Sequence, residues 1–356
     1  MSLPAVRIRG IVTPVTAVTA RAPAKVNLQL AVGPARARGY HDVVTVYHAV
    51  SLFDEVTVAP AEHDSVSVTG EGADSVPADD SNLAVRAVAE LLRTVGPGAK
   101  DSPGLAIRIS KRIPVAAGLA GGSADAAAAL VACNELWRTG LSQAELCEVA
   151  ASVGSDAAFG LVGGTAIGVG RGERVTPALA AGTYHWVLAF ASGGLSTAQV
   201  YAAWDRIRAS HGGPDASRGG PDGSAAAAVK PAGRVRSGRT STAAPPGSPA
   251  LDNRLMAALR SGNPAKVGPL LANDLQPAAI SLRPDLRRTL AAGMEHGALA
   301  AIVSGSGPTC AYLAKDARHA ADLAVALAGA GVCRTVAHVL GPVPGASVTG
   351  IATASM

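Results

Sequence analysis

Aromatic residues and cysteine are scarce in this chain of 356 residues. Phenylalanine, tryptophan and tyrosine together make up 3% of it, so alanine, valine, leucine and isoleucine must build its core. The cysteines have no C-x-x-C or other ligand-like spacing, which argues against a zinc or disulfide framework. Each lies in an apolar stretch, and we expect buried structural thiols. The cysteines are Cys133, Cys147, Cys310 and Cys333.

Long apolar runs are also missing. No run approaches the roughly 20 residues that span a bilayer. Arg7, Arg9 and Pro14 interrupt the N-terminal residues, which therefore lack the continuous apolar region of a signal peptide. The sequence predicts a cytoplasmic protein with no membrane partner. Hydrophobic residues make up 48% and charged residues 16%, as is typical of a globular chain long enough for two domains.

The positive charge is concentrated in one segment. The net charge of the chain is +5. Residues 208–250 hold six arginines and lysines against two aspartates, so this segment alone has a net charge of +4. The segment has no leucine, isoleucine, methionine or aromatic residue and cannot bury enough apolar surface to offset its ordering entropy. We expect a disordered surface insertion and no nucleic-acid partner. A basic arm that binds polyanions is the alternative.

Two common nucleotide-binding fingerprints, G-x-x-x-x-G-K-[ST] and G-x-G-x-x-G, are absent, but a different glycine-rich loop is present. It follows an alternating apolar stretch at 105–110 and precedes a run of alanines, which predicts a strand, a loop and a helix opened by Ser123. Glycines let a polyanion approach backbone N–H groups, and a helix start attracts anions. We therefore expect this loop to bind the phosphates of a nucleotide. Its residues are Pro114, Val115, Ala116, Ala117, Gly118, Leu119, Ala120, Gly121, Gly122, Ser123 and Ala124.

This loop resembles the second motif of the GHMP kinase superfamily, Pro-x-x-x-Gly-Leu-Gly-Ser-Ser-Ala. Other segments are similar to further parts of that family in the same order: 23–28 to the first motif, 38–41 to a cytidine-recognising segment, 154–166 to the catalytic aspartate region and 304–309 to the third motif. The resemblance covers about residues 19 to 345. Ala117 and Ala120 stand where many relatives carry glycine, and Gln29 replaces a more usual apolar residue. We expect phosphate binding to survive these departures.

The resemblance implies an α+β fold of two domains with the active site in the cleft between them. We expect an N-terminal domain at 1–180 and a C-terminal domain at 181–350, the latter interrupted at about 208–250. The residue patterns predict strands within 15–32, 43–70, 185–191, 300–303, 310–313 and 333–339. They predict helices over about 82–95, 142–154, 197–208, 251–260, 282–294 and 317–328. The first of these helices is expected to be capped by Asp80 or Ser81, and the second opens with a capping box at 142–145.

The resemblance also implies phosphoryl transfer from ATP, accompanied by Mg²⁺, to an alcohol. Asp156 would accept the proton of the substrate hydroxyl, and Lys25 would keep Asp156 ionised and stabilise charge near the γ-phosphate. From the residues alone, a solvated strand lysine and a helix-end carboxylate are the alternatives. Ser123 is a candidate to contact the metal, whose ligands are otherwise unassigned.

The implied substrate is a small molecule, a cytidine diphosphate conjugate of methylerythritol phosphorylated at its 2-hydroxyl. Tyr40 can stack on a pyrimidine, His41 offers it a hydrogen-bond donor and acceptor, and the resemblance places Tyr201 on its other face. Asn27 lies two residues after Lys25, on the same strand face, and is expected to contact substrate. Ordinary packing is the alternative for the aromatic residues.

A second glycine-rich loop is expected to shape the region of the substrate phosphates, with a plain hairpin turn as the alternative. It contains Ser304, Gly305, Ser306 and Gly307. Two other functions remain open. A homoserine or mevalonate kinase would keep the phosphate loop but not need Tyr40 and His41, and a nucleic-acid-binding protein would use the basic insertion.

Overall fold

A computed structural model describes residues 15–36, 39–96, 98, 103–210 and 248–353. Most of the predicted insertion, from 211 to 247, lies outside the described residues. Its first residues, 208–210, differ from the prediction because they form the last turn of helix α5 (Thr197–Ser210).

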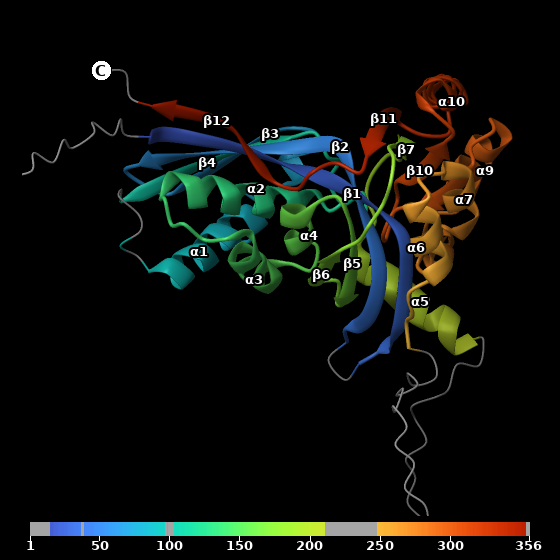
Figure 1. Ribbon diagram of the computed structural model, residues 1–356, viewed down its shortest axis with the longest axis horizontal. Coiled ribbons are helices and arrows are strands. Elements are labelled where there is room, and N and C mark those ends of the chain that lie inside the picture. The colour runs from blue at the N-terminus through green and yellow to red at the C-terminus, as the bar shows by residue number, and fades with distance from the viewer. Residues whose placement is uncertain (1–14, 37–38, 97, 99–102, 211–247, 354–356) are drawn as a thin grey trace, which may run out of the picture.

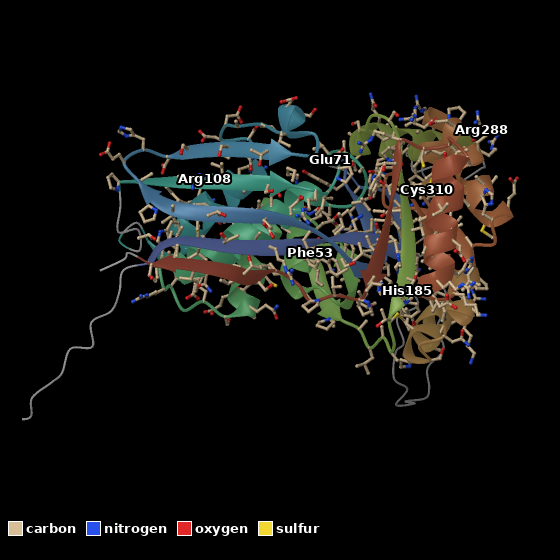
Figure 2. All side chains as sticks on the ribbon, turned by 90° about the horizontal axis from the view of Figure 1, so that it is seen from above. Phe53, Glu71, Arg108, His185, Arg288 and Cys310 are labelled. Atoms are coloured by element: carbon tan, nitrogen blue, oxygen red, sulfur yellow. The ribbon has the colours of Figure 1, made fainter. Side chains whose placement is uncertain are left out.

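The N-terminal half is built on an eight-stranded sheet whose central path runs β12–β1–β2–β4–β3. Its strands are β1 (Val15–Ala35), β2 (His41–Ala61), β3 (Ser65–Gly70), β4 (Gly104–Lys111), β5 (Thr165–Gly170), β6 (Arg174–Pro177), β8 (Ala272–Asn273) and β12 (Ser347–Thr353). The helices α1 (Leu83–Val95), α2 (Gly121–Leu136), α3 (Gln143–Val153) and α4 (Ala157–Val162) lie on one face of this sheet (Figure 1). Figure 2 looks onto the other face, where Phe53 and Arg108 lie over the strands with these helices behind.

The C-terminal half is built on a four-stranded sheet in the order β11–β7–β10–β9. Its strands are β7 (Tyr184–Phe190), β9 (Ala300–Val303), β10 (Cys310–Ala314) and β11 (Thr335–Gly341). With α5, its helices are α6 (Asn253–Arg260), α7 (Pro264–Val267), α8 (Gln276–Leu282), α9 (Asp285–Glu295) and α10 (Ala317–Gly329). This arrangement confirms the predicted α+β fold. The domain boundary at residue 180 stays a prediction.

Strand β12 and helix α8 were not predicted from the sequence. Although β12 follows the C-terminal half in the chain, it returns to the first sheet and pairs antiparallel with β1 (Figure 1). Most of its side chains are exposed, so it lacks the alternation of apolar and polar residues by which a half-buried strand is recognised.

Small side chains build the core, as the composition predicts. Helix α2 contacts β1, β2 and the helices α1, α3 and α4, and its alanines are buried on several sides. A Cβ added at Gly160 would lie 2.8 Å from the Cβ of Ala127, so glycine is needed where α4 approaches α2. This close packing fixes α2, and with it the glycine-rich loop at its start.

Two helix starts differ from the sequence prediction. The cap of α1 is Asn82, not Asp80 or Ser81, because the Asn82 side chain accepts a hydrogen bond from the N–H of Ala84. Helix α2 begins at Gly121 rather than at Ser123, which lies in its first turn. The capping box of α3 is confirmed, since Ser142 and Glu145 bond reciprocally.

The cysteine prediction is only half correct. Cys133 and Cys310 are buried, whereas Cys147 and Cys333 are partly exposed. Burial nevertheless raises the thiol pKa of both partly exposed cysteines, which keeps them protonated. Among the described helices, none is long and apolar enough to cross a membrane.

Candidate active site

A cavity of about 880 Å³ lies between the two halves and collects most of the predicted site residues. Strands β1 and β2 contribute to it from the first half, and α5 contributes from the second. The chain segments at 114–118 and 154–156 form further parts of the wall, as do residues at 75–83. The predicted site residues along this wall are Lys25, Asn27, Tyr40, His41, Pro114, Val115, Ala116, Ala117, Gly118, Ala120, Gly121, Gly122, Ser123, Asp156, Tyr201, Gly305 and Ser306.

Four predicted site residues do not line this cavity. The side chains of Leu119 and Ala124 are buried in the hydrophobic core. Ser304 is fully buried beneath the loop, and a Cβ at Gly307 would meet Val303 at 2.8 Å. These residues support the cavity wall from behind.

The glycine-rich loop uses two alanines in a left-handed backbone conformation. Ala116 has a φ of 52° and Ala120 has a φ of 62°, a region in which side chains other than glycine cost about 1–2 kcal/mol. Gly118 also has a positive φ, and a Cβ there would lie 2.1 Å from the carbonyl oxygen of Ser304. Glycine at position 118 therefore lets the two glycine-rich loops touch.

The first turn of α2 forms part of the cavity wall. The residues at its first turn, Gly121, Gly122 and Ser123, all line the cavity. The first N–H groups of a helix lack partners within the helix, and together with its dipole they attract anions. This geometry suits the phosphates of a nucleotide.

A buried lysine lies beside this helix start but its charge is already paired. Lys111 forms ion pairs with Asp54 and, at 2.6 Å, with Asp125 of α2. Burial raises the pKa of Asp125 to about 7; the charge of Lys111 opposes this effect, and the carboxyl group of Asp54 adds to it. Oδ1 of Asp125 has no hydrogen-bond partner among the described residues. Sequence reasoning missed this cluster.

Lys25 lines the cavity, and three oxygen atoms surround its Nζ. Its Nζ donates to Oδ1 of Asn27 at 2.6 Å and to the carbonyl of Gly118 at 2.8 Å, and it lies 3.9 Å from Oδ2 of Asp156. Burial lowers the pKa of Lys25, and the charge of Asp156 partly opposes this effect. The lysine is therefore buried beside Asp156 and is not a solvated strand residue.

Lys25 and Asn27 face the same space because they lie two residues apart in a regularly paired stretch of β1, between two shifts in its pairing. The pairing of β1 with β2 shifts between Pro23 and Ala24, and again between Asn27 and Gln29. Such irregularities bend a strand and redirect its side chains. Asn27 in turn donates from Nδ2 to Oγ1 of Thr45 at 2.8 Å, which fixes the amide that holds Lys25.

Asp156 stands at the N-cap position of α4 but does not cap it, since its side chain bonds no helix N–H. Its carboxylate is directed elsewhere: the hydroxyl of Tyr47 donates to Oδ1 at 2.7 Å, while Oδ2 faces Lys25. Burial, followed by the charge of Asp156, raises the pKa of Tyr47 well above its usual value, so its O–H stays a donor. Tyr47 was not predicted, because its proximity to Asp156 depends on tertiary structure.

The predicted base-recognition residues lie together on the cavity wall. The rings of His41 and Tyr201 lie 4.8 Å apart between centroids, tilted by 35°. Nε2 of His41 hydrogen-bonds to Oδ1 of Asp205 at 2.8 Å. Tyr40 is 58% exposed at the rim, with the guanidinium of Arg171 5.5 Å from its ring centroid. Asp205 and Arg171 were not identified from the sequence.

The second glycine-rich loop joins both halves of the site. Oγ of Ser304 donates to the carbonyl of Gly118 at 3.1 Å. A Cβ at Gly305 would lie 2.8 Å from Nζ of Lys25, so glycine makes room for the lysine. Ser306 exchanges a 3.0 Å hydroxyl hydrogen bond with Thr197 at the start of α5.

Oxygen donors for a cation are present in the cavity. In the described part of the chain, no three or more His, Cys, Asp or Glu residues cluster as metal ligands. Mg²⁺ needs no such cage, because it commonly uses one or two protein oxygens, phosphate oxygens and water. Oγ of Ser123 lies 3.8 Å from where a Cβ on Gly154 would be, so it faces the segment that carries Asp156.

Comparison with known proteins agrees with this geometry. Residues 82–167 match the family model "GHMP kinases N terminal domain", and residues 255–333 match "GHMP kinases C terminal". The chain is 51% identical over 335 residues to a 4-diphosphocytidyl-2-C-methyl-D-erythritol kinase of Mycolicibacterium gilvum, with 94% of each chain covered. It is 50% identical over 341 residues to the protein of that name from Thermobifida fusca, with 94% of this chain and 98% of that one covered.

A solved structure of a 4-(cytidine 5′-diphospho)-2C-methyl-D-erythritol kinase has a TM-score of 0.65 and 29% identity, covering 91% of this chain and 99% of that one. A homoserine kinase from Cytophaga hutchinsonii has a TM-score of 0.61 at 17% identity, covering 97% of this chain and 100% of that one. The second likeness shows the fold alone. The chain therefore belongs to the GHMP kinases and, within them, to the family of 4-diphosphocytidyl-2-C-methyl-D-erythritol kinases.

Proposed function

We propose that this chain transfers the γ-phosphoryl group of ATP to the 2-hydroxyl of 4-diphosphocytidyl-2-C-methyl-D-erythritol. This reaction belongs to the non-mevalonate (MEP) pathway of isoprenoid precursor biosynthesis. The supporting observation is that one cavity is lined by a buried lysine paired with a half-buried aspartate, by a loop of phosphate-binding type and by an aromatic–histidine cluster. A homoserine or mevalonate kinase would leave that cluster without a ligand.

Lys25 and Asp156 are the proposed catalytic residues. The oxygen of the substrate hydroxyl forms a bond to the γ-phosphorus of ATP while the bond from this phosphorus to the leaving ADP breaks. Asp156 accepts the proton that the hydroxyl loses. A loose, metaphosphate-like transition state needs little help from a strong base, because the proton can leave late. Lys25 supplies positive charge beside the moving phosphoryl group, and its bonds to Asn27 and Gly118 hold it in place.

The N-terminal turn of α2 and the loop at 114–120 are proposed to hold the phosphates of ATP. Mg²⁺, when bound, supplies positive charge that offsets the charge of the phosphates. The oxygens proposed to face it are Oγ of Ser123 and the carboxylate of Asp156, which line the same cavity. Lys111 contributes little charge there because two carboxyl groups already face it.

The cytosine base is proposed to lie against Tyr201 and His41, with Tyr40 able to cover it from the rim. Burial raises the pKa of Tyr201 to about 12, so its hydroxyl stays protonated. The second glycine-rich loop, through Gly305 and Ser306, lies beside Lys25 and is proposed to bound the diphosphate region.

Steady-state turnover with three acceptors tests this proposal. The purified chain is incubated with ATP, Mg²⁺ and either the cytidine diphosphate conjugate, homoserine or mevalonate, and ADP release is followed. We expect turnover with the conjugate alone, with a new phosphate monoester at the 2-position in its ³¹P spectrum. Turnover with homoserine or mevalonate and none with the conjugate would refute it.

A further inference from the structure

The orientation of the His41 ring is set from the opposite half of the molecule. His41 is the first residue of β2, whereas its partner Asp205 lies on α5, 164 residues away in the chain. Tyr201, one helical turn before Asp205, packs its ring against the same imidazole. Helix α5 thus touches the imidazole twice, once at a ring nitrogen and once with an aromatic ring.

This contact determines which ring nitrogen carries the proton. An ionised carboxylate accepts hydrogen bonds and cannot donate them, so Nε2 of His41 must donate to Oδ1 of Asp205. In the neutral imidazole the other nitrogen, Nδ1, is then an acceptor. Among the described residues Nδ1 has no hydrogen-bond partner, and His41 lines the cavity. A ligand group that reaches Nδ1 would therefore meet an acceptor.

An acceptor at Nδ1 distinguishes the two common pyrimidines. Cytosine carries an exocyclic amine at C4, which donates, whereas uracil carries a carbonyl oxygen there, which accepts. A uracil in this orientation would place two acceptors against each other and leave both without a donor. A site built for one hydrogen bond discriminates strongly against a ligand that cannot form it.

We propose that Asp205 is a positioning residue that makes the site select cytosine over uracil by fixing the Nε2–H tautomer of His41. The inference rests on the proposed function, since it takes a cytidine nucleotide as the ligand at this end of the cavity. Asp205 need not touch the base, because it acts through His41.

Two variants separate this role from simple packing. In Asp205→Asn, the amide can either donate to or accept from Nε2, so both tautomers of His41 become possible. Asp205→Ala removes the partner altogether. Asp42→Asn is the matched control: Asp42 is adjacent to His41 in the chain, but its carboxylate pairs with Arg36 and not with the imidazole.

The experiment measures binding of CDP and UDP to the full-length chain by calorimetry, and records the ¹⁵N shifts of the His41 ring. Because one such hydrogen bond is at stake, we expect the wild type and Asp42→Asn to prefer CDP over UDP by about tenfold or more. In both Asp205 variants the ratio of CDP affinity to UDP affinity should fall by about tenfold. The ¹⁵N shifts of the His41 ring should no longer be those of the Nε2–H tautomer alone. A thermal melt of each variant checks that it is folded.

The possible failures have different meanings. If the wild type prefers CDP and both Asp205 variants keep that preference, Asp205 has no role in selection, while the proposed function stands. A wild-type spectrum with the proton on Nδ1 would equally overturn the inference alone. Equal binding of CDP and UDP by the wild type would overturn cytosine recognition itself, and the proposed substrate with it.

Discussion

The hydroxyl of Tyr47 lies 2.7 Å from Oδ1 of Asp156 and donates a hydrogen bond to it. The other carboxylate oxygen faces Nζ of Lys25 at 3.9 Å. Asp156 is therefore held at both oxygens, by a neutral donor from β2 and by a cation from β1. The two strands pair with Asn27 opposite Tyr47, so the register of β1 and β2 sets this arrangement.

Replacing Tyr47 by phenylalanine tests the importance of that hydrogen bond. The ring stacks on Phe159 with centroids 4.7 Å apart, and phenylalanine keeps this contact. We expect kcat to fall about tenfold, since a hydrogen bond to a charged group is worth about 1.5–3 kcal/mol. The melting temperature should change little. Steady-state kinetics and a thermal melt give both numbers, and an unaltered kcat would show that Lys25 alone positions Asp156.

The buried cluster around Lys111 predicts a pH-dependent stability. The carboxyl pKa of Asp125 is about 7 in the folded chain against 3.8 for the ordinary group. The folded state thus holds this proton up to a higher pH than the unfolded state, so stability falls as the pH rises from about 4 to 7 and is constant above. Asparagine at position 125 cannot titrate. We therefore expect the free energy of unfolding of Asp125→Asn to lack this decrease between about pH 4 and pH 7.

Urea unfolding at pH 5 and pH 8 measures the effect. Relative to Asp125→Asn, the wild type should lose about 1–3 kcal/mol of unfolding free energy between these two pH values. Asp42→Asn, on the surface, should behave as the wild type does. A free-energy difference between wild type and Asp125→Asn that is the same at both pH values would refute a raised pKa for Asp125.

The strained alanine at the start of α2 predicts a stabilising substitution. Ala120 has φ 62° and ψ 33°, a conformation that glycine adopts without steric cost. We expect Ala120→Gly to raise the free energy of unfolding by about 1 kcal/mol. Ala117→Gly is the control, because the φ of Ala117 is not positive and glycine there should destabilise by about 0.5–1 kcal/mol. Equal effects at both positions would exclude local strain as the cause.

Parts of the fold and of the candidate site could be predicted where a short sequence motif is enough to identify them. The glycine-rich loop, the lysine of the first strand and the aspartate after α3 were all predicted, and the cavity brings Lys25 and Asp156 together. The capping box of α3 was predicted because its two partners are three residues apart. The loop and the capping box depend on neighbours in the chain, whereas Lys25 and Asp156 were identified through the family resemblance.

Features that depend on distant contacts were missed. Tyr47 reaches Asp156 across 109 residues of sequence, and Asp205 reaches His41 across 164. No local pattern distinguishes these residues from others on the same strand or helix. Gln29 shows the same limit: it departs from the family pattern, and its side chain bonds the backbone of Ala250 and Asp252, which holds the chain just before α6.

The most direct measurement is the turnover of Asp156→Asn, which keeps the size of the side chain but cannot accept the proton as a carboxylate does. With ATP, Mg²⁺ and the cytidine diphosphate conjugate, we expect kcat to fall by about a hundredfold to ten-thousandfold. ATP binding, measured by calorimetry, should stay nearly unchanged, because the loop and α2 are the segments proposed to hold the phosphates. Turnover near the wild-type value in a folded variant would contradict the assignment of Asp156, and with it the proposed mechanism.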